Sequence, residues 1–129
     1  MLSFANQLSS PMSDTPFRSL ANDDDWADAR AQSEEQPVLL FKHSDACPVS
    51  AKANGEMKEL AADAPLPVYK LVVQNSRALS DEIAETLDVR HETPQAIVLD
   101  DRMATFDTSH FDVTVDTLRD AVPSAVSSE

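Results

Sequence analysis

The sequence predicts an α/β domain in which helices cover both faces of a four-stranded mixed sheet. Short apolar runs of strand length alternate along the chain with segments of helical periodicity. Aromatic residues make up only 5% of the chain, so Val, Leu, Ile and Ala must form most of the core, as in sheets that are buried on both faces. At 129 residues the chain is long enough for one such domain and too short for two.

The first predicted helix covers residues 19–31. Its acidic residues come early and Arg30 comes late, which is the order that a helix dipole favours. Asn22 is expected to cap the start of this helix, and Trp26 to anchor it in the core. Residues 38–41 follow as an uninterrupted apolar run, which is typical of a central strand covered on both faces.

A second helix and a second strand come next. The apolar spacing predicts a helix over residues 48–62, and Pro48 suits its first turn. Gly55 lies inside this helix and should weaken it by about 1 kcal/mol relative to alanine. Residues 68–73 are rich in β-branched side chains and predict a strand.

The next segments predict a helix followed by a hairpin. Residues 79–87 have helical spacing, with Ser80 as the expected N-cap. The runs at 96–99 and 103–107 predict two strands, joined by a tight turn at the aspartates 100–101. So short a link requires antiparallel neighbours, whereas the strand–helix–strand part requires parallel ones, and a mixed sheet satisfies both requirements.

A last helix completes the predicted domain. Either Asp112 or Thr114 can cap it, and its apolar side carries Val115, Leu118 and Val122. The ordered domain is predicted to span residues 17–121, between flexible tails at 1–16 and 122–129 that lack periodicity. This order of helices and strands predicts a thioredoxin-like arrangement.

Composition limits the partners of this chain. It carries 23 acidic and 10 basic residues, a formal net charge of −13. Phosphate backbones and anionic membranes would repel such a surface, so nucleic acid and membranes are not expected as partners. No stretch is long and apolar enough to cross a bilayer, and the first residues do not resemble a secretion signal. A single cysteine forms no internal disulfide and fits a reducing compartment, so we expect a cytoplasmic protein.

That cysteine, Cys47, lies where the first strand turns into the helix that begins at Pro48. The unpaired N–H groups and the positive dipole end of a helix start favour a thiolate, which is the nucleophile in disulfide exchange. His43 and Lys52 can add positive potential, whereas Asp45 opposes it. The sequence therefore predicts a lowered pKa for the Cys47 thiol.

Ser50 stands three residues after Cys47, at the position of the second cysteine in Cys-x-x-Cys oxidoreductases. A disulfide formed at Cys47 must therefore be released by a thiol from outside the chain, so the predicted chemistry is monothiol exchange. Ser50 can equally donate a hydrogen bond to the sulfur or cap the helix. Thr93 and Pro94 enter the third predicted strand where thioredoxin-like proteins place a cis-proline loop beside the reactive cysteine, so we predict a cis bond there.

The histidines allow more than one interpretation. His91 and Glu92 can orient a bound thiol or move a proton at neutral pH, or they can anchor the proline loop. His110 is expected to pack or cap before the last helix. The histidines and the cysteine do not occur at the spacings of Cys/His metal sites, so no metal site is predicted. The predicted core aromatics are Trp26, Phe41 and Phe106, the predicted catalytic residues Cys47, Ser50 and Pro94, and the predicted substrate-binding residues His43, Pro48, Thr93 and His91.

Three segments carry a resemblance to a known family: FKHSDACPVS at 41–50, VRHETPQAIV at 89–98 and SHFDVT at 109–114. Together they resemble the YtxJ-like monothiol bacilliredoxin family, over residues 20–118. The resemblance implies a thioredoxin-like fold and a reactive Cys47 that removes or transfers bacillithiol on oxidised protein thiols. It also implies bacillithiol-modified proteins as partners, and bacillithiol as an exchanging small thiol with no tightly bound cofactor.

Three alternatives remain open from the sequence. A cysteine peroxidase would reduce peroxide through a sulfenic acid at Cys47 and would need an arginine beside it, for which Arg90 is the nearest candidate. An iron–sulfur carrier of the monothiol glutaredoxin type shares a Cys-x-x-Ser start and takes further ligands from a bound small thiol. A binding module with an inert thiol is the simplest alternative, because a free cysteine is often just a small apolar residue.

Overall fold

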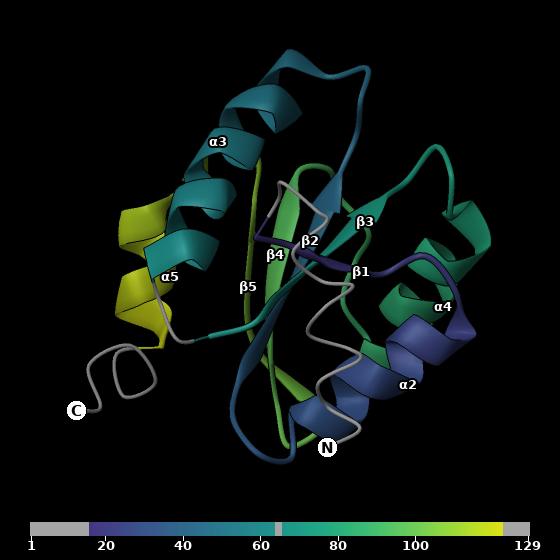
Figure 1. Ribbon diagram of the computed structural model, residues 1–129. Helices are drawn as coiled ribbons and strands as arrows, with labels where there is room; N and C mark the ends of the chain where they lie inside the picture. Colours follow the sequence, from purple (N-terminus) through teal and green to yellow (C-terminus); the bar gives the residue numbers. More distant parts are fainter. Residues whose placement is uncertain (1–15, 64–65, 123–129) are drawn as a thin grey trace.

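The computed structural model describes residues 16–63 and 66–122, so both predicted tails lie almost entirely outside the described residues. The chain alternates helices and strands around one sheet (Figure 1). In order, the elements are β1 (Arg18–Ser19), α2 (Asp23–Gln32), β2 (Val38–His43), α3 (Pro48–Asp63), β3 (Val68–Val72), α4 (Arg77–Leu87), β4 (Gln95–Asp100), β5 (Met103–Ser109), the 3₁₀ turn η2 (His110–Asp112) and α5 (Val115–Ala121).

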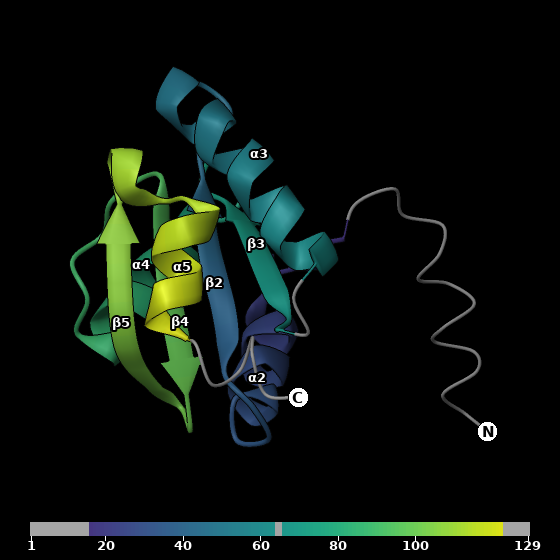
Figure 2. The same cartoon turned by 90° about the vertical axis from the view of Figure 1, so that its left-hand side faces the viewer.

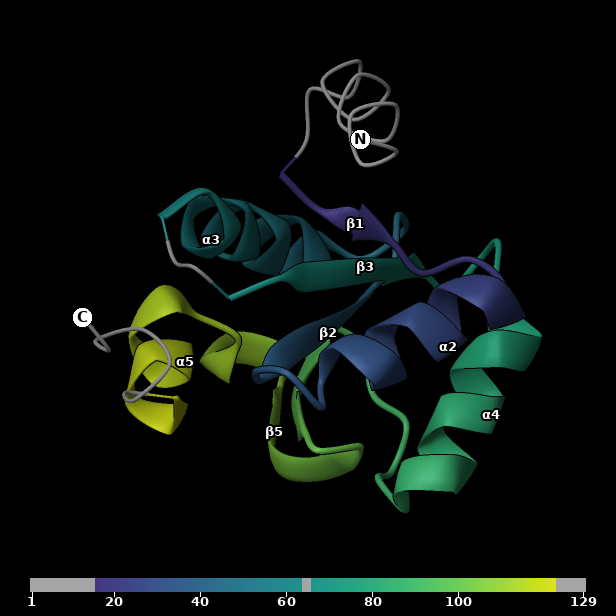
Figure 3. The same ribbon diagram turned by 60° about the horizontal axis from the view of Figure 1, so that its bottom comes forward.

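The sheet has the strand order β1-β3-β2-β4-β5. Strands β1, β3 and β2 run parallel, while β4 is antiparallel to both β2 and β5. Helices α3 and α5 cover one face, and α2 and α4 cover the other (Figure 3). The predicted mixed sheet of thioredoxin-like type is therefore confirmed. Among the described helices, none is long and apolar enough to cross a membrane.

The sheet has five strands rather than the predicted four, and the additional strand is β1. The helix predicted over residues 19–31 includes Ser19 and begins just after Arg18, but these two residues pair with Tyr69 and Lys70 of β3. A strand of two exposed residues has no hydrophobic alternation of its own. It forms because the outer edge of β3 presents unpaired backbone groups, and Leu20 N–H extends this pairing to the Lys70 carbonyl at 3.1 Å.

The central strand β2 is buried along its whole length. Leu39 and Phe41 face the core under α3 and α5, while Val38 and Leu40 face the core under α2 and α4. This two-sided burial explains the uninterrupted apolar run in the sequence. The strand continues two residues beyond the predicted end and takes Lys42 and His43 into the interior.

Helix α3 begins at Pro48 as predicted, whereas α2 begins four residues later than predicted and α4 two residues earlier. Asn22 caps α2 by accepting the Asp25 N–H at 2.9 Å, and Trp26 is buried behind it. Helix α4 begins at Arg77, so Ser80 lies one turn inside it and does not cap it. Ser80 is fully buried, and its hydroxyl lies against a histidine of the loop that follows the helix. Serine is favoured at helix caps, which is why the sequence predicts Ser80 as the cap. In the structure, its contact with the histidine explains the serine at this position instead.

The cap of α5 and the turn between β4 and β5 differ in detail from the predictions. Thr114, rather than Asp112, caps α5, with its Oγ1 accepting the Thr117 N–H at 3.2 Å. The hairpin turn consists of residues 101–102, both with positive φ, one residue later than predicted, because Asp100 still pairs with Met103. Of the predicted core aromatics, Trp26 and Phe41 are buried and Phe106 is partly buried. Val122, which follows α5, is buried in the core.

Gly55 offers a test of local helix stability. It lies on the exposed side of α3, and a Cβ added there would meet no atom within 4 Å. We expect Gly55→Ala to raise the free energy of unfolding by about 1 kcal/mol, because alanine loses less backbone entropy in a helix. Urea unfolding of both proteins measures this. A decrease in the free energy of unfolding would contradict the solvent-exposed position of Gly55 in α3.

Candidate functional site

The candidate site lies at the edge of the sheet where β2 ends and α3 begins. Cys47 immediately precedes Pro48, the first residue of α3, and its carbonyl accepts the first helical hydrogen bond from Ala51 N–H at 3.1 Å. Proline fits this position because a helix has no partner for its first N–H groups. The cysteine is free and partly exposed, and Pro48 is exposed beside it. Figures 1 and 2 show this end of α3 projecting beyond the sheet. The predicted position of Cys47 at a helix start is confirmed.

The helix start lowers the pKa of the Cys47 thiol. The largest cause is the backbone N–H of Ser50, which hydrogen-bonds the sulfur, and the N–H of Val49 and the hydroxyl of Ser50 act in the same direction. Partial burial of the sulfur opposes them. Each donor favours the charged form, so Cys47 is a better source of thiolate near neutral pH than a free cysteine.

His43 does not supply the positive potential that the sequence analysis assigned to it. Its ring is buried at the end of β2, and its Nε2 lies 3.0 Å from Asp45 Oδ1. Burial, together with the charge of Lys70, lowers the pKa of His43, while Asp45 only partly opposes this. The ring is therefore neutral at pH 7, and the pair fixes the first residues after β2 in place.

The loop between β2 and α3 is held by a residue that the sequence analysis missed. Gln74, just after β3, donates from Nε2 to Ser44 Oγ at 2.8 Å and accepts the Asp45 N–H at 3.1 Å. Ser50 is fully buried and its hydroxyl lies 3.3 Å from the Ser44 N–H. A lone glutamine after a strand gives no sequence signal of this role. Gln74 and Ser50 together fix the loop that presents Cys47.

The predicted cis bond between Thr93 and Pro94 is present. Strand β4 starts at the next residue, Gln95, which pairs with Lys42 of β2. Continuing this antiparallel register places Pro94 beside His43, at the same sheet edge as the loop to Cys47. The carbonyl of Pro94 also accepts the His110 N–H at 2.9 Å, which ties the turn η2 to this edge.

The loop before Pro94 is anchored by its own side chains. Nδ1 of His91 lies 3.3 Å from Lys42 Nζ and 3.1 Å from Ser80 Oγ. Glu92 lies 3.3 Å from the ring of His110 and 3.7 Å from Arg90. Through Nδ1, His91 anchors the loop, while its Nε2 has no hydrogen-bond partner among the described residues. Glu92 holds His110 in a pair, and His110 does not cap the last helix.

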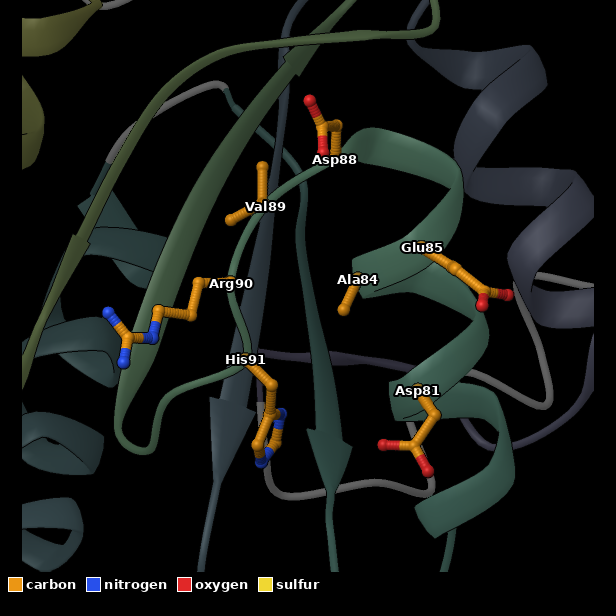
Figure 4. Close-up of a pocket in the computed structure, with 7 residues that line it drawn as sticks. All are labelled: Asp81, Ala84, Glu85, Asp88, Val89, Arg90 and His91. Carbon is orange, nitrogen blue, oxygen red and sulfur yellow. The ribbon is translucent and has the colours of Figure 1, made fainter.

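Arg90, the candidate for a peroxidase site, has a side chain that is 90% exposed and forms an ion pair with Glu92, two residues further along the chain. It lines a pocket of about 470 Å³ between α4 and the loop that follows it, with His91 at one end (Figure 4).

Within residues 16–63 and 66–122, no three His, Cys, Asp or Glu side chains lie close enough together to hold a metal ion.

Comparison with protein families identifies this arrangement. Residues 18–118 match the family described as monothiol bacilliredoxin BrxC. This segment contains Cys47, Ser50 and the Thr93–Pro94 bond. The chain belongs to this family. The resemblance seen in the sequence is thereby confirmed, and a bacilliredoxin of this type is a thiol–disulfide redox protein.

Solved structures agree with this assignment. The bacilliredoxin is 32% identical to a protein of thioredoxin fold, described provisionally as an oxidoreductase, with a TM-score of 0.73 and coverage of 81% of this chain and 91% of that one. A mutant thioredoxin from Halobacterium salinarum is 18% identical, with a TM-score of 0.69 over 88% of this chain and 95% of that one. A thioredoxin from Fasciola hepatica is 15% identical, with a TM-score of 0.68 over 84% and 99%. The two thioredoxins show the fold alone.

Proposed function

We propose that this bacilliredoxin reduces mixed disulfides between bacillithiol and protein cysteines, with Cys47 as the nucleophile. The observation that carries the proposal is the state of the thiol, which is partly exposed at a helix start and has a pKa lowered by N–H donors. The chain has no other cysteine, so a thiol from solution has to resolve the intermediate. Membership of the bacilliredoxin family supports bacillithiol as that thiol and a reducing compartment, the cytoplasm, as its location.

The reaction would proceed through one covalent intermediate. The Cys47 thiolate attacks the bacillithiol sulfur of the mixed disulfide, a disulfide forms between bacillithiol and Cys47, and the protein thiolate leaves and takes a proton from water. A second bacillithiol thiolate then attacks the same sulfur. This step releases the Cys47 thiolate and bacillithiol disulfide. The reducing equivalent for the protein cysteine comes from the second bacillithiol thiol, which is oxidised to the disulfide level, whereas the first bacillithiol sulfur is disulfide-bonded throughout.

The side chains around Cys47 would have distinct parts in this reaction. Ser50 would stabilise the thiolate both as attacking group and as leaving group, because its N–H and hydroxyl favour the charged sulfur. Pro48 and Thr93 are accessible and would contact the bound disulfide, while the buried Pro94 would fix the adjacent backbone. His43 would act through Asp45 on the shape of the loop.

Mass spectrometry tests the proposal. The reduced protein is incubated with bacillithiol disulfide, and separately with a protein that carries bacillithiol on one cysteine. We expect a single bacillithiol adduct at Cys47 in the first case and a free target thiol in the second. Cys47→Ser should show neither, because serine forms no disulfide.

Ser50→Ala serves as the matched variant. It removes the hydroxyl but keeps the backbone N–H, so the adduct should still form, more slowly at pH 6 because less of the thiol is ionised. The proposal fails if the wild type alkylates readily at Cys47 yet gains no bacillithiol and releases no target thiol. In that case the thiol is reactive but serves another substrate.

A further inference from the structure

A buried polar cluster lies under the loop that leads to Pro94. The side chain of Lys42 is fully buried at the end of β2, and its Nζ donates to the carbonyl of Ser80 at 3.0 Å. The same Nζ lies 3.3 Å from Nδ1 of His91, and Ser80 Oγ lies 3.1 Å from that nitrogen. The cluster therefore joins β2, α4 and the loop after α4 at the edge of the sheet that carries the exchange site.

The donors in this cluster determine the tautomer of His91. An ammonium group has donors only, so Nδ1 of His91 must be unprotonated where it faces Lys42. Burial, followed by the charge of Lys42, lowers the pKa of His91; Arg77 acts in the same direction, and Asp81 and Glu92 oppose it. The ring is therefore neutral and carries its proton on Nε2. Among the described residues, no group accepts a hydrogen bond from that Nε2.

The lysine is costly for the fold. No carboxylate in the described part of the chain lies within ion-pair distance of its Nζ. Burial lowers the pKa of Lys42 to about 8, which Asp81 only partly opposes. An apolar side chain of similar size would fill the same space without this penalty.

A second buried side chain holds the same loop. Gln95 pairs with Lys42 across the strands, so both side chains lie on one face of the sheet. Gln95 is 1% exposed, and its Nε2 donates to the Arg90 carbonyl at 2.8 Å. The backbone before His91 and the ring of His91 are therefore both fixed from below, by two side chains from adjoining strands.

We propose that Lys42 is a positioning residue for the exchange reaction: with Ser80 it fixes His91 as a neutral imidazole whose Nε2–H donates a hydrogen bond to a carbonyl or carboxylate oxygen of the small thiol in the mixed disulfide. The inference rests on the proposed function and specifies which part of the substrate is recognised. His91 is separated from Pro94 by two residues, so an oxygen a few bonds from the reacting sulfur would meet it. Lys42 itself would touch no substrate.

The tautomer is measured directly by nitrogen NMR of the ¹⁵N-labelled, reduced full-length protein at pH 7. The ring signals of His91 are assigned by their loss in His91→Ala. We expect Nδ1 to have the shift of an unprotonated ring nitrogen and Nε2 that of an N–H. In Lys42→Met, both nitrogens should move toward the average of two tautomers. A wild-type ring that is protonated at Nδ1, or doubly protonated, overturns the proposal without any variant.

Kinetics test the recognition. One target protein is capped on its cysteine with bacillithiol, which has amide and carboxylate oxygens, or with cysteamine, which keeps the thiol and amine but has no oxygen. We expect His91→Ala and Lys42→Met each to lose about tenfold in kcat/KM with the bacillithiol cap and less than about twofold with the cysteamine cap. The double variant should lose no more than either single one, because both remove the same hydrogen bond.

Lys58→Met is the matched control, since Lys58 is an exposed lysine of α3. It should leave both rates unchanged, and the alkylation rate of Cys47 should be the same in all variants. Equal losses with both caps would show a merely structural role and overturn the inference. If the wild type forms the bacillithiol adduct but His91→Ala loses no activity, this inference fails while the proposed function stands. If the wild type forms no adduct, the proposed function fails first.

Discussion

Phe41→Ala is expected to lower the free energy of unfolding by about 3–5 kcal/mol, a large part of the total for a domain of this size. Phe41 is fully buried in β2, in the core that supports α3. Its ring lies 6.0 Å from that of Phe17 and 5.8 Å from that of His43. Truncation would leave a cavity under α3, the helix whose start adjoins Cys47, and the backbone of a central strand cannot move to close it. Thermal unfolding should show a decrease in Tm of more than about 10 °C.

Phe111 provides the matched control, because it is the same residue type with 74% of its surface exposed. Phe111→Ala should change the free energy of unfolding by less than about 0.5 kcal/mol. If the two variants were equally stable, the layer between β2 and α3 would not be the tightly packed core that the structure shows.

The parts of the fold that the sequence predicted are those in which the local pattern and tertiary burial agree. The apolar run of β2 has one explanation, a strand buried on both faces. Pro48 marks the start of α3 because few other positions tolerate its missing N–H. These two features together locate Cys47 at a helix start. The N–H groups at this helix start favour the thiolate that disulfide exchange requires, so the sequence predicts the feature on which the reactivity of the site depends.

The remaining features depend on contacts between distant segments. The predicted strand over residues 38–41 stops before Lys42, but the strand continues and α4 covers the lysine side chain. Gln74 holds the loop before Cys47 only because β3 ends beside β2. Residues 18–19 become a strand only because β3 has a free edge. No residue type or spacing signals such roles, since each is created by a neighbour that is far away in the chain.

Two buried titratable side chains, Tyr69 and Lys42, predict how the free energy of unfolding depends on pH in the alkaline range. Tyr69, the only tyrosine of the chain, is buried in β3 and donates its hydroxyl hydrogen to Asp28 Oδ2 at 2.8 Å. Burial, followed by this hydrogen bond, raises the pKa of Tyr69 to about 12. In the unfolded chain a tyrosine has a pKa of about 10. Between these values the unfolded chain has lost the proton that the folded protein keeps, so stability falls as the pH rises.

Lys42 makes the free energy of unfolding rise with pH, over a lower pH range than that of Tyr69. Its pKa falls from 10.5 to about 8 on folding. Between these values the folded protein has lost a proton that the unfolded chain still holds, so stability rises with pH. We therefore expect the free energy of unfolding to increase above pH 8, reach a maximum near pH 10 and then decrease, by about 2 kcal/mol on each side. Urea unfolding between pH 7 and 12 measures this curve.

Two variants separate the contributions of these side chains. Lys42→Met should remove most of the rise and leave the smaller part that comes from the lowered pKa values of Cys47 and Lys70. Tyr69→Phe should remove the fall. Phenolate absorbance of the folded protein reports Tyr69 alone, because the chain has one tyrosine. A phenolate midpoint near pH 10 would contradict the burial of this side chain. A flat curve in the wild type would mean that Lys42 reaches water, and the fixed tautomer of His91 would then lose its physical basis.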